Sequence, residues 1–354
     1  MSTRLFTVGP VEVRTEVLQS MNRSMITHRS KDYKDLHRGI VEKLKKALET
    51  DMNIIMASTS SSGFLESCVR CGVQSKMLGI SNGSFGERWQ KIGTSNGKEV
   101  VKLQVPWGKA VRSEELEGMV DESIEAVTLV SNESSTGVFN PVEDLVNAIR
   151  EQGDPLIFMD GVTSVAAIDL HLDRMEVDAL VFGTQKALAL PPGLAVICAS
   201  DRLLEKAKNV ENRGFYFDLL GLKKYADKDL AMTTPPVSLM YGLDFQLDRV
   251  LREGMDSRYA RHREMADTVR EWAERNSGLF AEEGHRSNTI TVVNNTDIAF
   301  DTIQNSLRGK GYEISGGYGK LKDETYRIGH MGDLNVADIR KFLAVMDQVM
   351  EELA

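Results

Sequence analysis

Seven short apolar runs lie between residues 54 and 199, and their spacing constrains the fold more than any other feature. The runs are 54–57, 77–80, 100–103, 126–130, 156–159, 179–182 and 194–197. Near-continuous apolarity is typical of strands covered on both faces, as in a largely parallel sheet. Helical patterns lie between several runs, such as the apolar face formed by Val142, Leu145, Val146 and Ile149. The sequence therefore predicts an α/β fold with a doubly wound, mainly parallel, seven-stranded sheet.

From about residue 255 the pattern changes. A charged helical segment (256–275) is followed by two strand-like segments (289–293 and 326–329) and a final amphipathic helix. This order is typical of a separate α+β unit. We expect a large domain, a smaller α+β C-terminal domain and an N-terminal segment packed near the active site. Their predicted ranges are 15–254, 255–354 and 1–14.

Composition excludes several classes of protein. The 354 residues are 42% hydrophobic and 27% charged, with a formal net charge of −9. An acidic chain argues against nucleic acid or an anionic membrane surface as partner. No apolar segment approaches the roughly 18 residues needed to cross a bilayer, and the first residues lack a signal peptide's apolar core. Three cysteines form no disulfide framework, so we expect a cytoplasmic protein.

No metal site is expected. Cys68 and Cys71 are spaced like a ligand pair, but zinc requires four ligands and no second cysteine pair or suitably spaced histidine pair accompanies them. Two buried thiols one helical turn apart are the better interpretation.

Two strand ends suggest the chemistry. Lys186 follows the apolar run 179–182 and precedes Pro191-Pro192-Gly193, which cannot continue a helix. A lysine in apolar surroundings shifts toward the neutral amine, which can attack a carbonyl and form a Schiff base. Asp160 ends the run 156–159. Pyridoxal phosphate requires this pair, a lysine for its aldehyde and an acid for its pyridine nitrogen.

Polar groups follow other strands of the predicted sheet. The run Ser58–Gly63 lies between a strand and a helix, where hydroxyls and free amides suit a phosphate, although an ordinary helix cap is the alternative. Phe85, between glycines, offers a ring that could stack on a flat cofactor, or is a core aromatic. The loop 132–137 adds hydroxyls. Ligands of open α/β sheets bind at this carboxyl edge.

Arg327 is the candidate for binding a substrate carboxylate, because its guanidinium can bind both oxygens at once. The alternative is a surface ion pair. We expect the nearby Gly329 and Gly332 to ease the close approach of a ligand.

Taken together, these motifs resemble the class V aminotransferases, a branch of the type I fold of pyridoxal-phosphate enzymes, and above all the serine–pyruvate and alanine–glyoxylate group. The resemblance runs nearly end to end. The matching segments are 7–10, 28–30, 133–137, 160–164, 185–188, 191–193, 233–237 and 327–332. Two departures concern the cofactor site: an unbroken serine run replaces the family's usual mixture with glycine, and Phe85 stands where a tryptophan is frequent.

The resemblance assigns roles to residues. Lys186 would form the internal aldimine with the cofactor, Asp160 would pair with the pyridinium, and Arg327 would take the substrate carboxylate. The cofactor-binding set that it implies is Ser60, Ser61, Ser62, Phe85, Ser134, Asp160, Val162, Gln185, Lys186 and Thr234. Gly9 joins the substrate site, and Thr234 would reach across a homodimer to the neighbour's phosphate, so that active sites are shared.

The expected activity is transfer of an amino group from a small amino acid, serine or alanine, to a 2-oxo acid, pyruvate or glyoxylate. Aspartate or phosphoserine remains an alternative donor if Arg29 meets a distal acidic group rather than pairing with Asp32. A pyridoxal-phosphate lyase or desulfurase is a weaker alternative, because no cysteine lies near Arg327 in the sequence. A non-catalytic cofactor-binding protein is the alternative from another class.

Overall fold

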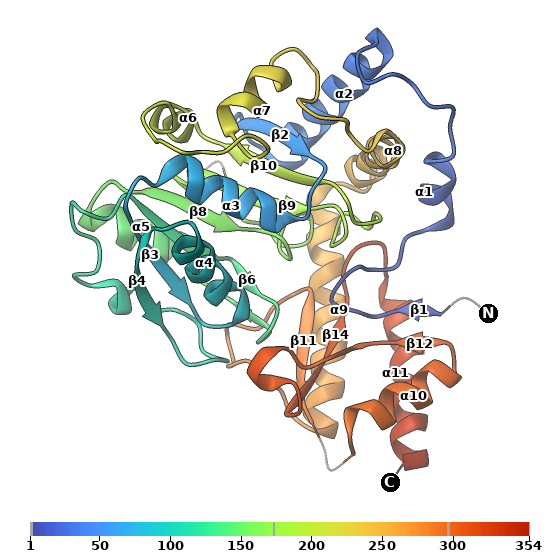
Figure 1. Cartoon of the computed structure of the whole chain (residues 1–354). Helices are drawn as coiled ribbons and strands as arrows, with labels where there is room; N and C mark the ends of the chain where they lie inside the picture. Colours follow the sequence, from blue (N-terminus) through green and yellow to red (C-terminus); the bar gives the residue numbers. More distant parts are fainter. Residues whose placement is uncertain (1–2, 173, 296–297, 354) are drawn as a thin grey trace.

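The computed structural model describes residues 3–172, 174–295 and 298–353. Among these residues, a seven-stranded sheet with strand order β2-β10-β9-β8-β5-β3-β4 forms the centre (Figure 1). In that order, the strands are Asn53–Ala57, Ala195–Ala199, Ala179–Gly183, Leu156–Asp160, Ala126–Val130, Lys76–Ser81 and Glu99–Gln104. Each predicted apolar run corresponds to one strand. The α/β fold and its seven strands are therefore confirmed.

The sheet is parallel except at β10. Parallel pairs join β4 to β3, β3 to β5, β5 to β8 and β8 to β9, whereas β10 runs antiparallel to both β9 and β2. A parallel neighbour needs a long crossover connection. Only residues 184–194, including Pro191-Pro192-Gly193, join β9 to β10, and no helix forms there. The chain therefore turns back directly.

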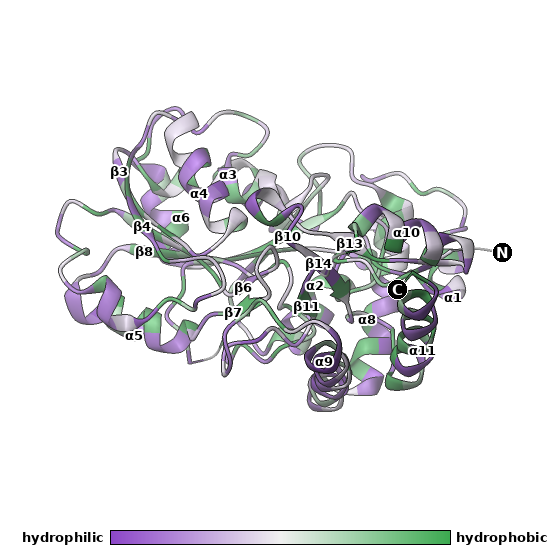
Figure 2. Ribbon diagram, turned by 90° about the horizontal axis from the view of Figure 1, so that it is seen from below, coloured by the Kyte–Doolittle hydropathy of each residue, from purple (hydrophilic) through white to green (hydrophobic). Residues whose placement is uncertain are grey.

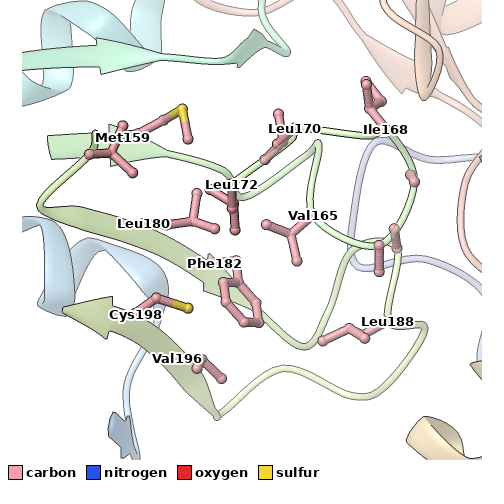
Figure 3. Packing of buried hydrophobic residues seen from close by; sticks show 14 of the residues in the cluster. Met159, Val165, Ile168, Leu170, Leu172, Leu180, Phe182, Leu188, Val196 and Cys198 are labelled. Carbon is pink, nitrogen blue, oxygen red and sulfur yellow. The ribbon is translucent and has the colours of Figure 1, made fainter. Parts of the chain in front are cut away.

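Helices cover both faces of the sheet. Ile54 and Met56 point to a core shared with α2, α5 and α8, whereas Ile55 and Ala57 point to a core shared with α3, α4, α6 and α7. Figure 3 shows part of the first core, where Phe182 and Val196 meet Leu188. On the first face, helices α2, α5 and α8 span Lys31–Leu48, Val142–Gln152 and Val237–Glu253, respectively. On the second face, helices α3, α4, α6 and α7 span Ser61–Gly72, Ser84–Ser95, Asp201–Lys208 and Leu219–Ala226, respectively. Burial on both faces explains why the strands lack polar alternation.

The C-terminal part is a smaller α+β unit, as predicted. Its antiparallel sheet has the order β11-β14-β13. These strands are Ile290–Asn294, Thr325–Gly329 and Ser315–Gly316. Helices α9, α10 and α11 span Met255–Asn276, Phe300–Gly309 and Val336–Leu353. Hydrophobic and hydrophilic residues both occur along α11, which packs one side on the small core (Figure 2). No helix of the described residues is long and apolar enough to span a membrane.

The N-terminal segment joins this C-terminal unit, which sequence patterns did not predict. Strand β1 (Arg4–Leu5) pairs in parallel with β12 (Tyr312–Glu313). The ring of Phe6 stacks on Phe342 at 4.1 Å. Short elements complete the chain, namely α1 (Thr15–Ser20), β6 (Asn132–Glu133), β7 (Val138–Phe139) and the 3-10 turns 113–116 and 319–321. After β1, the N-terminal segment continues toward the carboxyl edge of the large sheet, where Val8 contacts Lys186.

Candidate active site

A cavity of about 370 Å³ opens at the carboxyl edge of the large sheet. Of the residues proposed from the sequence to bind cofactor or substrate, all line it except Arg327, Thr234 and Arg29. Those lining residues are Gly9, Ser60, Ser61, Ser62, Phe85, Ser134, Asp160, Val162, Gln185 and Lys186. The ends of β2, β3, β5, β8 and β9 deliver them, as expected for a ligand site in an open α/β sheet.

Lys186 projects into the cavity from the turn after β9. Its Nζ donates a hydrogen bond of 2.6 Å to the carbonyl oxygen of Val8. Burial, together with the nearby guanidinium of Arg327, lowers the pKa of the lysine to about 8, and Asp160 opposes the shift. Gly9, at a φ of +128°, leaves room for this side chain, since a Cβ there would lie 2.8 Å from Nζ. The amine is therefore poised near its neutral, nucleophilic form.

Asp160 ends β8 and is 4% exposed. Its Oδ1 accepts a 2.9 Å hydrogen bond from the backbone amide of Val162. Burial raises the pKa of the carboxyl to about 6, and the neighbouring Glu133 contributes in the same direction. A buried acid of this kind gains from a cationic partner such as a protonated pyridine nitrogen.

The serine run forms the N-terminus of α3, with Ser60 as its N-cap residue. The hydroxyl of Ser61 is buried and has no hydrogen-bond partner among the described residues. It converges with the side chain of Gln185, because a Cβ on Gly183 would lie 2.6 Å from Ser61 Oγ and 2.5 Å from Gln185 Oε1. A vacant buried donor beside free helix amides fits a phosphate dianion.

Phe85 belongs to a stack that spans both parts of the chain. The guanidinium of Arg88 lies 4.6 Å from the centre of its ring. Tyr318, from the C-terminal unit, stacks on Phe85 with ring centres 5.5 Å apart and accepts a hydrogen bond from Arg88 at 3.3 Å. Arg88 also donates to Ser62 Oγ at 3.2 Å and lines the cavity. Sequence reasoning missed Arg88, although its i+3 spacing from Phe85 places both on one helix face.

Glu133 is a second residue that sequence reasoning missed. Its fully buried carboxylate accepts backbone hydrogen bonds from Phe85 at 2.9 Å and Gly86 at 3.1 Å. It also accepts from the amide of Ser135 at 3.1 Å and from its hydroxyl at 2.5 Å. Burial raises the pKa of Glu133. The carboxylate ties the Phe85 turn to the loop that carries Ser134.

Arg327 lies in β14 behind Ser134. Its Nε donates to the carbonyl of Gly316 at 2.8 Å and its Nη1 to that of Ser134 at 3.2 Å. Burial lowers the pKa of the guanidinium to about 10. The Nη2 group has no protein acceptor among the described residues, so the guanidinium can still receive a carboxylate.

The two nearby glycines make room for the chain rather than for a ligand, so that part of the sequence interpretation was wrong. A Cβ on Gly329 would lie 2.0 Å from the carbonyl oxygen of Thr7, and one on Gly332 would lie 3.1 Å from Ala189. The N-terminal segment passes directly over β14, and the amide of Gly329 donates to the carbonyl of Phe6 at 2.7 Å.

Thr234 and Arg29 lie outside this cavity. Thr234 is exposed in the loop before α8, where its carbonyl accepts a hydrogen bond from Ser58 Oγ at 3.2 Å. Arg29 is exposed, donates to the carbonyl of Ala231 at 2.9 Å and lies 5.5 Å from the ring centre of Tyr225. Neither side chain lines the cavity.

Comparison with known proteins agrees with this geometry. Residues 19–320 match the aminotransferase class-V family. The chain belongs to this family. It is a pyridoxal-phosphate-dependent aminotransferase, as the sequence predicted.

Its relatives in the class V family match it over nearly their whole lengths. An uncharacterised aminotransferase of Methanocaldococcus jannaschii is 35% identical over 98% of this chain and 92% of the relative. A serine–glyoxylate aminotransferase of Methylorubrum extorquens is 30% identical, with coverages of 94% and 87%. The solved alanine–glyoxylate aminotransferase of Nostoc has a TM-score of 0.93 at 27% identity, with coverages of 99% and 96%. The type I fold is thereby confirmed.

Proposed function

We propose that Lys186 and Asp160 carry the transamination chemistry of this class V aminotransferase. The observation that carries the proposal is the buried Nζ of Lys186, whose pKa is about 8, in one cavity with the buried carboxyl of Asp160. Pyridoxal phosphate, when bound, supplies an electron sink for negative charge at the substrate α-carbon. Asp160 would hold the proton on its pyridine nitrogen. Lys186 Nζ would attach the cofactor and, once the substrate amine displaces it, would move a proton from the substrate α-carbon to carbon C4′ of the cofactor.

The remaining cavity residues would hold the cofactor. The amides and hydroxyls of Ser60, Ser61 and Ser62 would bind its phosphate together with Gln185, as the vacant Ser61 hydroxyl supports. Phe85 would stack on the ring, with Ser134 and Val162 beside it. Such stacking adds about 1 kcal/mol beyond burial.

Arg327 would bind the substrate carboxylate through its free Nη2, with Gly9 bordering the same site. A donor with a small side chain, serine or alanine, and a small acceptor, glyoxylate or pyruvate, fit best. The cavity of about 370 Å³ must hold both cofactor and substrate. The names of the serine–glyoxylate and alanine–glyoxylate relatives support the same choice.

Aspartate or phosphoserine is the alternative donor, and Arg88 rather than Arg29 favours it. Arg88 lines the cavity, whereas Arg29 lies outside it. A lyase that needs a cysteine nucleophile receives no support, since Cys68, Cys71 and Cys198 are buried and burial raises the pKa of each thiol.

We further propose a homodimer with shared active sites. Thr234 and the exposed side chains of Met25, Phe215 and Tyr216 support it, because exposed apolar groups mark contact surfaces. The Tyr216 hydroxyl donates to the carbonyl of Ser58 at 3.1 Å, which places this surface beside the phosphate loop. A neighbouring Thr234 would then reach the phosphate.

Domain boundaries and a location in the cell complete the proposal. We propose a large domain of residues 15–254 and a small domain of residues 255–354, with residues 1–14 at the active site. Gly254, at a φ of +82°, separates α8 from α9 at this boundary. The free cysteines support the reducing cytoplasm as the location.

Borohydride reduction tests the role of Lys186. The purified protein should be yellow, and reduction followed by peptide mass spectrometry should find a phosphopyridoxyl group on Lys186. Labelling of another lysine in cofactor-saturated protein would refute the assignment. Rates with serine, alanine, aspartate and phosphoserine, each paired with glyoxylate and pyruvate, would decide between the two donor classes.

A further inference from the structure

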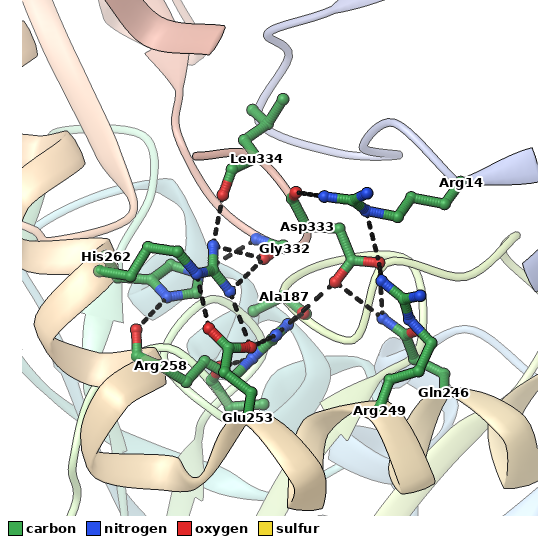
Figure 4. A network of polar contacts seen from close by, with 12 residues as sticks. Arg14, Ala187, Gln246, Arg249, Glu253, Arg258, His262, Gly332, Asp333 and Leu334 are labelled. Carbon is green, nitrogen blue, oxygen red and sulfur yellow. Dashed lines mark hydrogen bonds and ion pairs between the residues drawn. The ribbon is translucent and has the colours of Figure 1, made fainter. Parts of the chain in front are cut away.

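A second cavity, of about 440 Å³, lies where the N-terminal segment, α8, α9 and the turn after β14 meet. It shares no lining residue with the cavity around Lys186. Five arginines line it together with two acids. Figure 4 shows polar contacts of Arg14, Arg249 and Arg258 around these acids. The lining residues are Arg14, Arg249, Arg252, Glu253, Arg258, Arg261, Asp333, Leu334 and Asn335.

The charge of this lining is strongly unbalanced. Five guanidinium groups face the carboxylates of Glu253 and Asp333 in the lining and that of Glu16, which pairs with Arg249 at 2.8 Å, so the excess is 5 − 3 = 2 positive charges. The whole chain carries a net charge of −9. A local positive excess in an acidic protein raises the concentration of small anions at that place.

The two carboxylates are already shared among several donors. Glu253 accepts from Arg258 at 2.8 Å and from Arg261 at 2.6 Å. Asp333 accepts two 3.1 Å bonds from Gln246 and lies 3.6 Å from guanidinium nitrogens of Arg14, Arg249 and Arg258. These acids fix the positions of the guanidinium groups and neutralise part of their charge.

Donor capacity remains on the open side of the cavity. Arg252 is exposed and has no hydrogen bond or ion pair within the described part of the chain. Arg14 donates to the carbonyl oxygen of Asp333 at 2.8 Å, and Arg249 donates to Glu16 at 2.8 Å and to Gln246 at 3.1 Å. Each guanidinium group carries five N–H donors, so both are held in place and keep further donors. The cavity therefore offers preorganised cations from two walls, the N-terminal segment and α8.

We propose that this cavity is a binding site for a small multivalent anion that carries two or more carboxylate or phosphate groups. One anionic group would meet Arg252 and another would meet Arg14 or Arg249. A monovalent ion would fill little of 440 Å³ and would satisfy only one wall. Guanidinium groups bind both oxyanion classes through paired N–H donors.

The site connects to the active site through Arg258. This buried side chain donates to Glu253 in the cavity wall and, through Nη2, to the carbonyl of Ala187 at 2.6 Å. Ala187 follows Lys186 in the chain. An occupant of the cavity would therefore contact a network that ends one residue from the cofactor lysine.

Calorimetric titration of the cofactor-loaded protein with citrate and with pyrophosphate, at low ionic strength, tests the proposal. We expect one anion per chain with a dissociation constant of about 1 mM or lower. Arg252→Ala should weaken binding about tenfold, the loss of a charge-assisted contact, and Arg252→Glu should weaken it further. Binding of citrate alone assigns a carboxylate ligand, and binding of pyrophosphate alone assigns a phosphate ligand.

Arg263→Ala and Arg263→Glu are the matched controls. Arg263 is an exposed arginine of α9 outside the cavity lining, and its replacement changes the net charge equally. Both controls should bind like the wild type, and melting curves should show that all variants fold. Absence of binding by either anion would overturn the proposal, as would equal losses in the Arg252 and Arg263 variants.

Discussion

Replacing Gly9 by alanine tests how closely the N-terminal segment fits Lys186, the proposed cofactor-binding lysine. Gly9 follows Val8, whose carbonyl receives the hydrogen bond from Lys186 Nζ. A Cβ at Gly9 would lie 2.7 Å from Cδ and 2.8 Å from both Cε and Nζ of Lys186. Ordinary van der Waals contact begins near 3.4 Å, so the amine must move by about 0.6 Å or more. A misplacement approaching 1 Å can cost about a hundredfold in rate.

The substitution also strains the backbone, because Gly9 has a φ of +128°. Side chains rarely adopt such angles, and the cost is about 1–3 kcal/mol. An unfolding entropy of ~2.1 cal/mol/K per residue gives about 0.7 kcal/mol/K for 354 residues. The expected fall in melting temperature is therefore only about 1.5–4 °C.

Gly118→Ala is the matched control, because Gly118 has a φ of +72° and a Cβ added there would meet no atom within 4 Å. This variant carries the backbone cost alone. We expect similar melting temperatures for the two variants, but turnover about a hundredfold lower only in Gly9→Ala. Equal turnover in the two variants would refute the argument that Lys186 depends on the space at Gly9.

Three further predictions concern the remaining site residues. Arg327→Lys keeps the charge but loses the paired donors, so the amino donor, titrated by the spectral change of the cofactor, should bind about 2 kcal/mol more weakly while the cofactor stays bound. In cofactor-free protein, Asp160→Asn should raise stability by about 3 kcal/mol at pH 8, because the folded pKa of about 6 lies above the unfolded 3.8 and the buried carboxylate is costly above pH 6. The gain should vanish near pH 4, where the wild-type carboxyl is protonated in the folded state, and denaturant unfolding at both pH values measures it. If Thr234 acts on the neighbouring subunit, mixing equal amounts of inactive Thr234→Asp and Lys186→Ala should restore about a quarter of wild-type activity, since half of the two-fold dimers are hybrids with one intact site. Verified hybrids without activity would contradict that arrangement.

The sequence predicted the features that depend on neighbouring residues. Each apolar run became a strand, because a continuous apolar segment is a local pattern that can be read from the chain. Six of these strands are largely buried, whereas the edge strand β4 is partly exposed. Lys186 and Asp160 were found because both follow such runs, and the carboxyl ends of parallel strands meet at one edge. The serine run was recognised for the same reason.

Features that depend on distant pairings were missed. The pairing of β1 with β12 joins residues 4–5 to residues 312–313, and two-residue strands leave no periodic signal. Glu133 looked like one polar residue of a loop, since its hydrogen bonds to Phe85 and Gly86 join segments 47 and 48 residues apart. Gly329 was misread because its neighbour in space, Thr7, lies at the other end of the chain.

The N-terminal pairing has a consequence for synthesis on the ribosome. Val8, the hydrogen-bond acceptor of Lys186, is among the first residues made, yet the strand that anchors its segment follows roughly 300 residues later. At about 5–20 residues per second, that interval lasts about 15–60 s. During this time the large sheet can form and Val11 can donate to the carbonyl of Gln185, but the segment that carries Val8 and Gly9 lacks its pairing with β12. A chain released early would therefore contain Lys186 and the N-terminal segment but not the strand that pairs with this segment. The cavity around Lys186 can be completed only after translation has passed residue 313.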